Sequence, residues 1–89
     1  MKTHVLITGK VIMVGFRFFI KLNAKKLHLN GFVKNRSDGK LEALFIGEKE
    51  DIDKMLEKCK EGPLFAKVKE IVIIDDDISF DKDDFEIRF

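Results

Sequence analysis

The chain has 89 residues, of which 45% are hydrophobic and 37% are charged, and its formal net charge is +1. A chain of this length supports one hydrophobic core, so we expect residues 1–89 to form a single soluble domain. No apolar run approaches the roughly 18 residues that cross a bilayer, and the first residues lack a signal-peptide pattern, which predicts a cytoplasmic protein without membrane contact. The isolated Cys59, His4 and His28 predict neither an internal disulfide nor a metal site.

Charge is distributed unevenly along the chain. Residues 1–40 hold nine lysines and arginines against the single acid Asp38, whereas residues 41–89 hold eight against fifteen acids. Such a concentration of basic charge either attracts an anionic ligand or forms the solvated face of a helix.

The first half of the chain predicts a strand, a helix and a hairpin. Residues 3–8 (THVLIT) are rich in β-branched residues and precede a glycine, which favours a short strand that ends in a loop. From Arg17 the apolar residues recur with a helical period, which predicts one buried helix face (Phe16, Ile20, Ala24 and Leu27). Residues 32–35 and 41–47 then predict two antiparallel strands joined by a turn that contains Asp38-Gly39.

The second half predicts another helix and two more strands. A complete apolar stripe marks the helix (Ile52, Met55, Leu56 and Cys59), which ends at Gly62-Pro63. Residues 66–75 and 85–89 predict a fourth strand and a short fifth one. The acidic residues 75–84 between them lack the spacing of an EF-hand, which favours a solvated loop over a calcium site.

This order of elements predicts the fold class. The sequence β-α-β-β-α-β with a closing strand is typical of an α+β, ferredoxin-like split β-α-β sandwich, in which two helices cover one face of an antiparallel sheet. Because enzymes, RNA-binding domains and regulatory modules all use this architecture, the fold class does not choose among functions.

The loop between the first strand and the first helix, within GKVIMVGFRFF (residues 9–19), is the candidate site. At a helix N-terminus, unpaired backbone N–H groups and the helix dipole favour an anion. Gly15 lets a ligand approach the backbone closely, and Arg17 can donate two hydrogen bonds to phosphate oxygens. Alternatively, Gly15 only serves a turn and Arg17 only pairs with a carboxylate, so this chemistry alone leaves phosphate binding open.

A family resemblance starts in this loop. The stretch Gly9, Val11, Val14-Gly15-Phe16-Arg17 resembles the acylphosphatase signature. The resemblance covers nearly the whole chain (Phe19, Ala24, Leu27, Leu29, Gly31, Val33, Asn35, Asp38-Gly39, Gly47, Gly62-Pro63 and the closing FEIRF). Gly-Phe-Arg together with an Asn eighteen residues after Arg17 is more specific than either part alone.

The resemblance implies hydrolysis of small acyl phosphates, such as carboxyl or carbamoyl phosphate, to a carboxylate and inorganic phosphate, without metal or organic cofactor. It implies that Asn35 holds the attacking water. It also implies that Arg17 and the loop amides of residues 12–16 hold the phosphoryl group (Ile12, Met13, Val14, Gly15 and Phe16). Because the leaving carboxylate is a weak base, positioning and charge stabilisation can supply most of the effect. Taken alone, Asn35 would instead start the turn before Asp38-Gly39.

The loop also departs from the family pattern. Ile12 and Met13 stand where the family usually has Gln-Gly. If position 13 requires a positive φ, methionine there costs on the order of 1–2 kcal/mol. The altered loop leaves open an alternative function, that of a non-catalytic phosphate-binding module with the same fold. The family often has Gly near His28 and Pro near Ser37, changes that affect only caps and turns.

Nucleic-acid binding is a third hypothesis. Phe16, Phe18 and Phe19 faintly resemble the aromatic stretch of an RRM domain, but they fall in a helix, where phenylalanine usually belongs to the core. We therefore expect a monomer that acts on a small molecule and has no nucleic-acid partner.

Overall fold

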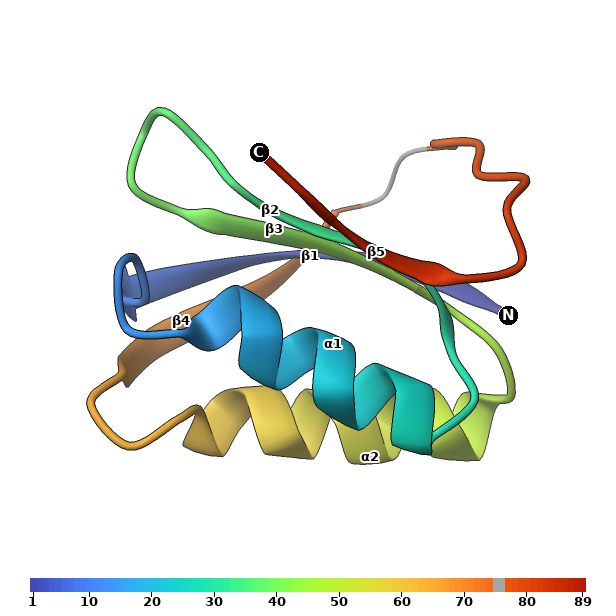
Figure 1. Cartoon of the computed structure of the whole chain (residues 1–89), viewed down its shortest axis with the longest axis horizontal. Helices are drawn as coiled ribbons and strands as arrows, with labels where there is room; N and C mark the ends of the chain where they lie inside the picture. Colours follow the sequence, from blue (N-terminus) through green and yellow to red (C-terminus); the bar gives the residue numbers. More distant parts are fainter. Residues whose placement is uncertain (75–76) are drawn as a thin grey trace.

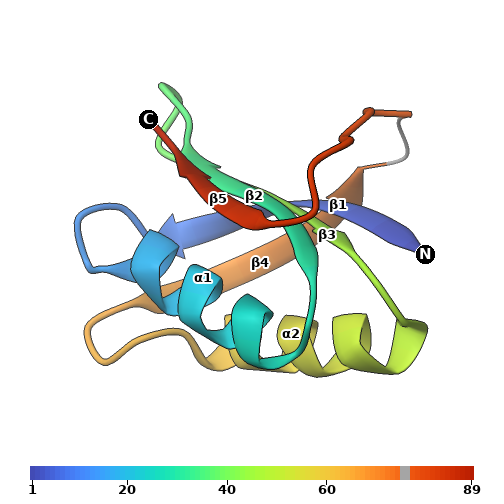
Figure 2. The same ribbon diagram turned by 45° about the vertical axis from the view of Figure 1, so that its right-hand side comes forward.

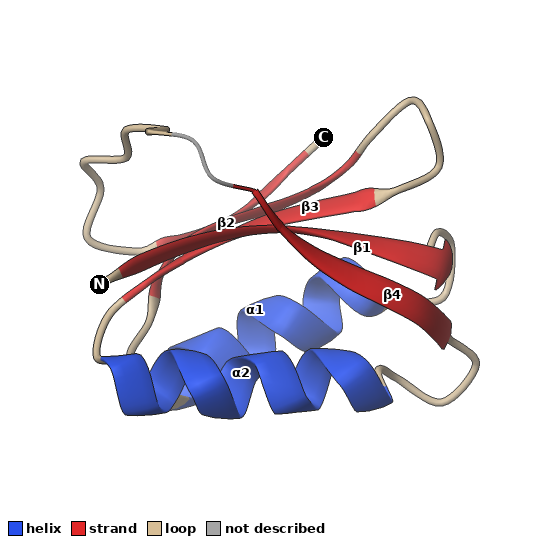
Figure 3. Ribbon diagram, turned by 180° about the vertical axis from the view of Figure 1, so that it is seen from behind, coloured by secondary structure: helices blue, strands red, loops and turns tan. Residues whose placement is uncertain are grey.

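The computed structural model describes residues 1–74 and 77–89. Its elements follow in the order β1 (Lys2–Lys10), α1 (Phe16–Lys26), β2 (Asn30–Asn35), β3 (Leu41–Ile46), α2 (Lys49–Glu61), β4 (Lys67–Ile74) and β5 (Phe85–Arg88). Figures 1 and 3 show both helices on the same face of one sheet. The predicted α+β, ferredoxin-like class is confirmed.

The strands pair in the order β4-β1-β3-β2-β5. β1 is antiparallel to β3 and β4, and β2 is antiparallel to β3, but β5 runs parallel to β2. The sheet is therefore mixed instead of wholly antiparallel, because β5 does not follow a strand by a hairpin but returns along the outer edge of β2. Since β1 and β2 are both antiparallel to β3, their C-terminal ends lie at the same edge of the sheet, on the left in Figures 1 and 2.

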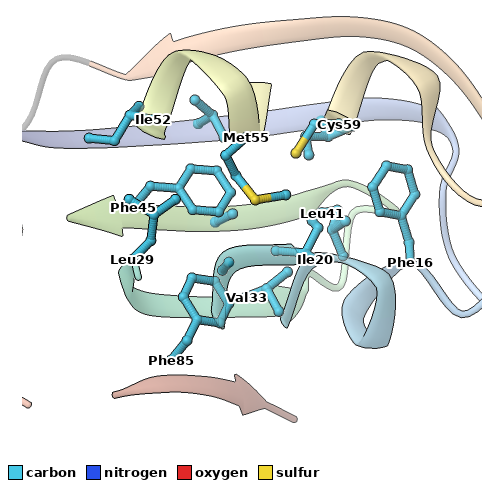
Figure 4. Close-up of a cluster of buried hydrophobic side chains, with 14 of the residues drawn as sticks. Phe16, Ile20, Leu29, Val33, Leu41, Phe45, Ile52, Met55, Cys59 and Phe85 are labelled. Carbon is cyan, nitrogen blue, oxygen red and sulfur yellow. The ribbon is translucent and has the colours of Figure 1, made fainter. Parts of the chain in front are cut away.

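The core lies between the sheet and the two helices, as the close-up in Figure 4 shows. Each helix buries one stripe of side chains, from α1 Phe16, Ile20 and Ala24 and from α2 Ile52, Met55 and Cys59. Sheet residues that include Val33, Leu41 and Phe45 pack in the same cluster. The helical stripes predicted from the sequence are confirmed, with Leu27 and Leu56 partly buried against this core.

Phe18 is an exception to the expectation that the phenylalanines of the first helix belong to the core. Phe16 is buried, and the Phe19 ring packs edge-on against it with the ring centres 5.8 Å apart. The Phe18 side chain is 67% exposed. A helix on a sheet buries one stripe, and Phe18 lies two residues beyond Phe16, roughly 200° around the helix axis. The core interpretation was therefore wrong for Phe18.

The acidic connection after β4 is only partly described. Asp75, the last residue of the predicted fourth strand, and Asp76 lie outside the described residues. Residues 77–84 form an irregular segment whose charged side chains are exposed, as expected of a solvated loop. Among residues 1–74 and 77–89, no group of three or more His, Cys, Asp or Glu is placed to hold a metal ion. None of the helices in the described chain has the length and apolar character needed to span a membrane.

Candidate active site

A pocket of about 210 Å³ opens at the edge of the sheet where β1 and β2 end. Residues from three separate segments of the chain line it (Val11, Met13, Gly15, Phe16, Arg17, Phe18, Asn35, Ile87 and Phe89). Arg17 and Asn35 contribute the polar side chains among these residues, and the others are glycine or apolar. Arg17 and Asn35, distant in the sequence, therefore line one shared pocket.

Arg17 lies in the first turn of α1. Its Nη1 donates a hydrogen bond to the backbone oxygen of Arg88 at 3.2 Å, and its guanidinium carbon lies 4.6 Å from the centre of the Phe89 ring. It pairs with no carboxylate in the described part of the chain. The alternative that Arg17 serves only an ion pair is therefore not supported. A guanidinium has several N–H donors, so this single bond leaves donors available for an oxyanion.

Asn35 is the last residue of β2 and lies opposite Leu41 of β3. Its Oδ1 is buried and accepts no hydrogen bond from any described residue. Buried polar atoms without a partner are rare in proteins, and each costs roughly 1–3 kcal/mol. An acceptor without an internal partner, on a residue that lines the same pocket as a guanidinium, is suited to a donor from outside the protein, such as a water molecule that it meets when the amide turns toward the pocket.

The turn after β2 does not use the Asn35 side chain. Residues 36–40 close it themselves: the Gly39 N–H donates to the Arg36 backbone oxygen at 3.2 Å, and the Asp38 carboxylate accepts from the Lys40 N–H at 3.1 Å. That backbone hydrogen bond, with the charges of Arg36 and Lys40, lowers the pKa of the Asp38 carboxyl below its usual value. The alternative that Asn35 only starts this turn is not supported by the contacts.

The β1–α1 loop lines the pocket through Met13 and Gly15. The side chains of Ile12 and Val14 pack against the core and do not line the pocket, whereas Met13 is 96% exposed and does. Met13 has a φ of 63° and Gly15 a φ of 75°, so the condition under which methionine at position 13 is strained is met. Such alternation of backbone conformation is typical of anion-binding nests. No backbone N–H of residues 12–16 donates a hydrogen bond within the described chain.

The two helices differ at their N-termini. α1 begins after Gly15, which provides no side-chain cap, and its first turn contains no acidic residue. The first turn of α2 contains Glu50 and Asp51, which complement the positive end of its dipole. At α1 the positive end faces the pocket without an internal anion, so it favours a bound one.

Sequence reasoning named the apolar lining residues Met13 and Phe16 but missed Ile87 and Phe89. The parallel register between β2 and β5 sets Lys34 opposite Arg88, which brings Phe89 next to Asn35. Nothing in the sequence indicated the direction of β5, so Ile87 and Phe89 were not found. For Phe18 a signal existed, because it lies off the apolar stripe of α1.

Comparison with known proteins agrees with the fold. Residues 3–87 match the family model described as Acylphosphatase. Curated relatives named Acylphosphatase include one from Moorella thermoacetica, 39% identical over 72 residues (81% of this chain and 77% of the relative), and one from Geobacillus kaustophilus, 35% identical over 88 residues (99% and 94%).

Solved structures give the same result. An acylphosphatase from Bacillus subtilis has a TM-score of 0.91 and 33% identity, over 99% of this chain and 98% of that one. Another, from Coxiella burnetii, has a TM-score of 0.89 and 36% identity, over 98% and 90%. The chain therefore belongs to the acylphosphatase family.

Proposed function

We propose that this protein hydrolyses acyl phosphates in the pocket between the β1–α1 loop and the end of β2. Membership of the acylphosphatase family supports acyl phosphate hydrolysis in general. For the individual residues, the observation that carries the proposal is that Arg17 and Asn35 line the same pocket and that the buried Oδ1 of Asn35 has no hydrogen-bond partner within the described chain.

In this proposal the phosphoryl group binds to Arg17 and to the backbone amides of residues 12–16. The loop supports this role because its N–H groups have no partner within the described chain. The dipole of α1, which follows the loop, is not neutralised by an acidic residue in the first turn. Arg17 adds charge-assisted hydrogen bonds, which strengthen as negative charge grows on the phosphoryl oxygens. The side chains of Ile12 and Val14 take no part, since they pack in the core.

Asn35 positions the nucleophile. Its Oδ1 accepts a hydrogen bond from a water molecule whose oxygen attacks phosphorus. A new P–O bond forms while the bond between phosphorus and the bridging anhydride oxygen breaks, and the carboxylate leaves with that electron pair. The proton of the water passes to solvent, and the products are a carboxylate and inorganic phosphate. Because a carboxylate is a weak base, it leaves without a general acid.

We also propose a domain organisation, an oligomeric state, a cellular location and a set of partners for this protein. Residues 1–89 act as a single acylphosphatase-like domain, a monomer in the cytoplasm, without a metal, an organic cofactor or a nucleic-acid partner. The position of Phe18 argues against RNA stacking, because Phe18 lies on α1 and not on a central strand.

Hydrolysis of benzoyl phosphate in the presence of a metal chelator tests the activity. We expect Arg17→Ala to lower kcat/KM by about a thousandfold or more and to abolish protection by phosphate against thermal unfolding. Asn35→Ala should lower kcat by roughly a hundredfold and retain that protection. Lys21→Ala and Asn30→Ala, which change the same types of group outside the pocket, serve as matched controls and should keep full activity.

Full activity in either pocket variant would remove the role assigned to that residue. Protection by phosphate without turnover in the unmodified protein would select the alternative, a non-catalytic phosphate-binding module. The specific observation that favours this alternative is the left-handed backbone of Met13, a conformation that costs methionine on the order of 1–2 kcal/mol.

A further inference from the structure

We propose that the mouth of the pocket selects acyl phosphates whose acyl group is apolar, and that Met13 is a specificity-determining residue together with Phe18 and Phe89. The inference rests on the proposed function, which places the phosphoryl group at the β1–α1 loop. It adds the chemical class of the acyl group.

Three large apolar side chains surround the pocket and are exposed to solvent. Met13 is 96% exposed, Phe89 97% and Phe18 67%, and all three line the same pocket as Arg17 and Asn35. Single exposed apolar residues are ordinary, but several gathered around one concave polar site are typical of a ligand-binding surface.

Their position fits the second half of the substrate. A phosphoryl group bound by the amides of residues 12–16 and by Arg17 directs its bridging oxygen, and the acyl group attached to it, away from the loop and toward solvent. The side chains at the mouth then flank the acyl group. The Phe89 ring already packs on the Arg17 guanidinium at 4.6 Å, which holds an aromatic surface next to the phosphate-binding cation.

The chemistry of these side chains favours an apolar partner. A benzoyl group buries a ring against Phe18 and Phe89 and contacts the thioether of Met13, a flexible side chain that adapts to aromatic surfaces. An acetyl group offers one methyl and gains much less from the same contacts. We expect kcat/KM for benzoyl phosphate to exceed that for acetyl phosphate about tenfold, which corresponds to about 1.4 kcal/mol.

The test compares the ratio of the two kcat/KM values among variants, so that the intrinsic reactivity of each substrate cancels. Met13→Gly should lower the benzoyl-to-acetyl ratio roughly threefold to tenfold, whereas Met13→Leu, which keeps an apolar side chain, should retain it. Phe89→Ala should lower the ratio as well. Phe65→Ala is the matched control, because Phe65 is 71% exposed but lies outside the pocket, and it should leave the ratio unchanged.

A ratio that changes less than about twofold in both Met13→Gly and Phe89→Ala would overturn the inference while leaving hydrolysis intact. If neither substrate is hydrolysed, the proposed function fails, and calorimetric binding of benzoylphosphonate against acetylphosphonate gives the same comparison without turnover. Tighter binding of benzoylphosphonate that Met13→Gly abolishes would support the apolar mouth, and equal affinities would contradict it.

Discussion

Two residues other than glycine adopt a left-handed backbone in the described chain, and their surroundings differ. His28, with a φ of 57°, follows α1, where its N–H donates to Lys25 at 3.1 Å and the next N–H, of Leu29, donates to Ala24 at 2.9 Å. This is a Schellman motif, in which the left-handed residue satisfies the last carbonyls of a helix. Met13, with a φ of 63°, lies in a loop whose N–H groups have no partner within the described residues.

The comparison shows how one backbone conformation serves two purposes. At His28 the strain is offset locally by hydrogen bonds that end a helix, so its benefit is stability. At Met13 no hydrogen bond from the described residues offsets the strain, so the conformation is maintained by the packing of Ile12 and Val14 against the core on either side. Unfavourable backbone conformations of this kind gather at ligand sites, where they preorganise binding groups.

Proline substitutions at Met13 and His28 should have the largest effects, because proline fixes φ near −65° and has no N–H. We expect the substitution at Met13 to change activity and the substitution at His28 to change stability. Met13→Pro should reshape the loop and lower kcat/KM for acyl phosphate at least a hundredfold, while the thermal midpoint changes little. His28→Pro should lower the free energy of unfolding by about 3 kcal/mol, because it removes the bond to Lys25, and should keep the activity of the folded fraction. Measured activity and denaturant unfolding that show the reverse pattern would contradict the comparison.

Glycine at the same positions should relieve the strain. Met13→Gly and His28→Gly should each stabilise the protein by about 0.5–1 kcal/mol. Glycine removes the cost of a left-handed backbone, but it also loses more chain entropy on folding, and this figure is the difference between the two effects. Burial raises the pKa of the Cys59 thiol to about 12, so thiol labelling reports opening of the fold and should slow in both variants.

Only the loop variant should also change catalysis. Met13→Gly, alone or with Ile12→Gln, should raise kcat/KM for acetyl phosphate by up to about tenfold if the loop is strained. An unchanged rate in the loop variants, or an increase in His28→Gly, would discard the strain explanation.

Low pH should have the smallest effect on stability, through the single ion pair between Lys25 and Asp84. The hydrogen bond from the Lys25 side chain, together with the Phe85 N–H, lowers the pKa of the Asp84 carboxyl below the usual 3.8. Because Asp84 binds its proton more weakly in the folded chain, the stabilisation it contributes is present above about pH 4 and is lost as the pH falls through the folded pKa. Lys25→Met should therefore flatten the acid limb of unfolding, whereas Met13→Gly should shift stability equally at each pH. Equal acid limbs in the parent and Lys25→Met would refute this role of the pair.

Much of the fold followed from sequence periodicity. The stripes of α1 and α2 and the Asp38-Gly39 turn specify local structure, and these local choices agree with one two-layer arrangement. The direction of β5 did not follow, because four residues without a hairpin turn carry no information about which neighbour they pair with or in which sense.

The candidate site was also predicted only in part. Arg17 and Asn35 were found because their residue types and spacing resemble a family pattern, and the condition stated for φ at position 13 is met. The orphaned Oδ1 of Asn35 and the contact of Phe89 with Arg17 depend on tertiary packing of distant segments. No local pattern in the sequence encodes such contacts.

The most direct test of the central claim is a titration of the protein with inorganic phosphate, followed by nuclear magnetic resonance of its N–H groups. We expect the largest shifts on the backbone amides of residues 12–16, the Arg17 guanidinium and the Asn35 side-chain amide, and we expect them to disappear in Arg17→Ala. Saturable phosphate shifts confined to another surface, or shifts at the loop that persist in Arg17→Ala, would contradict it.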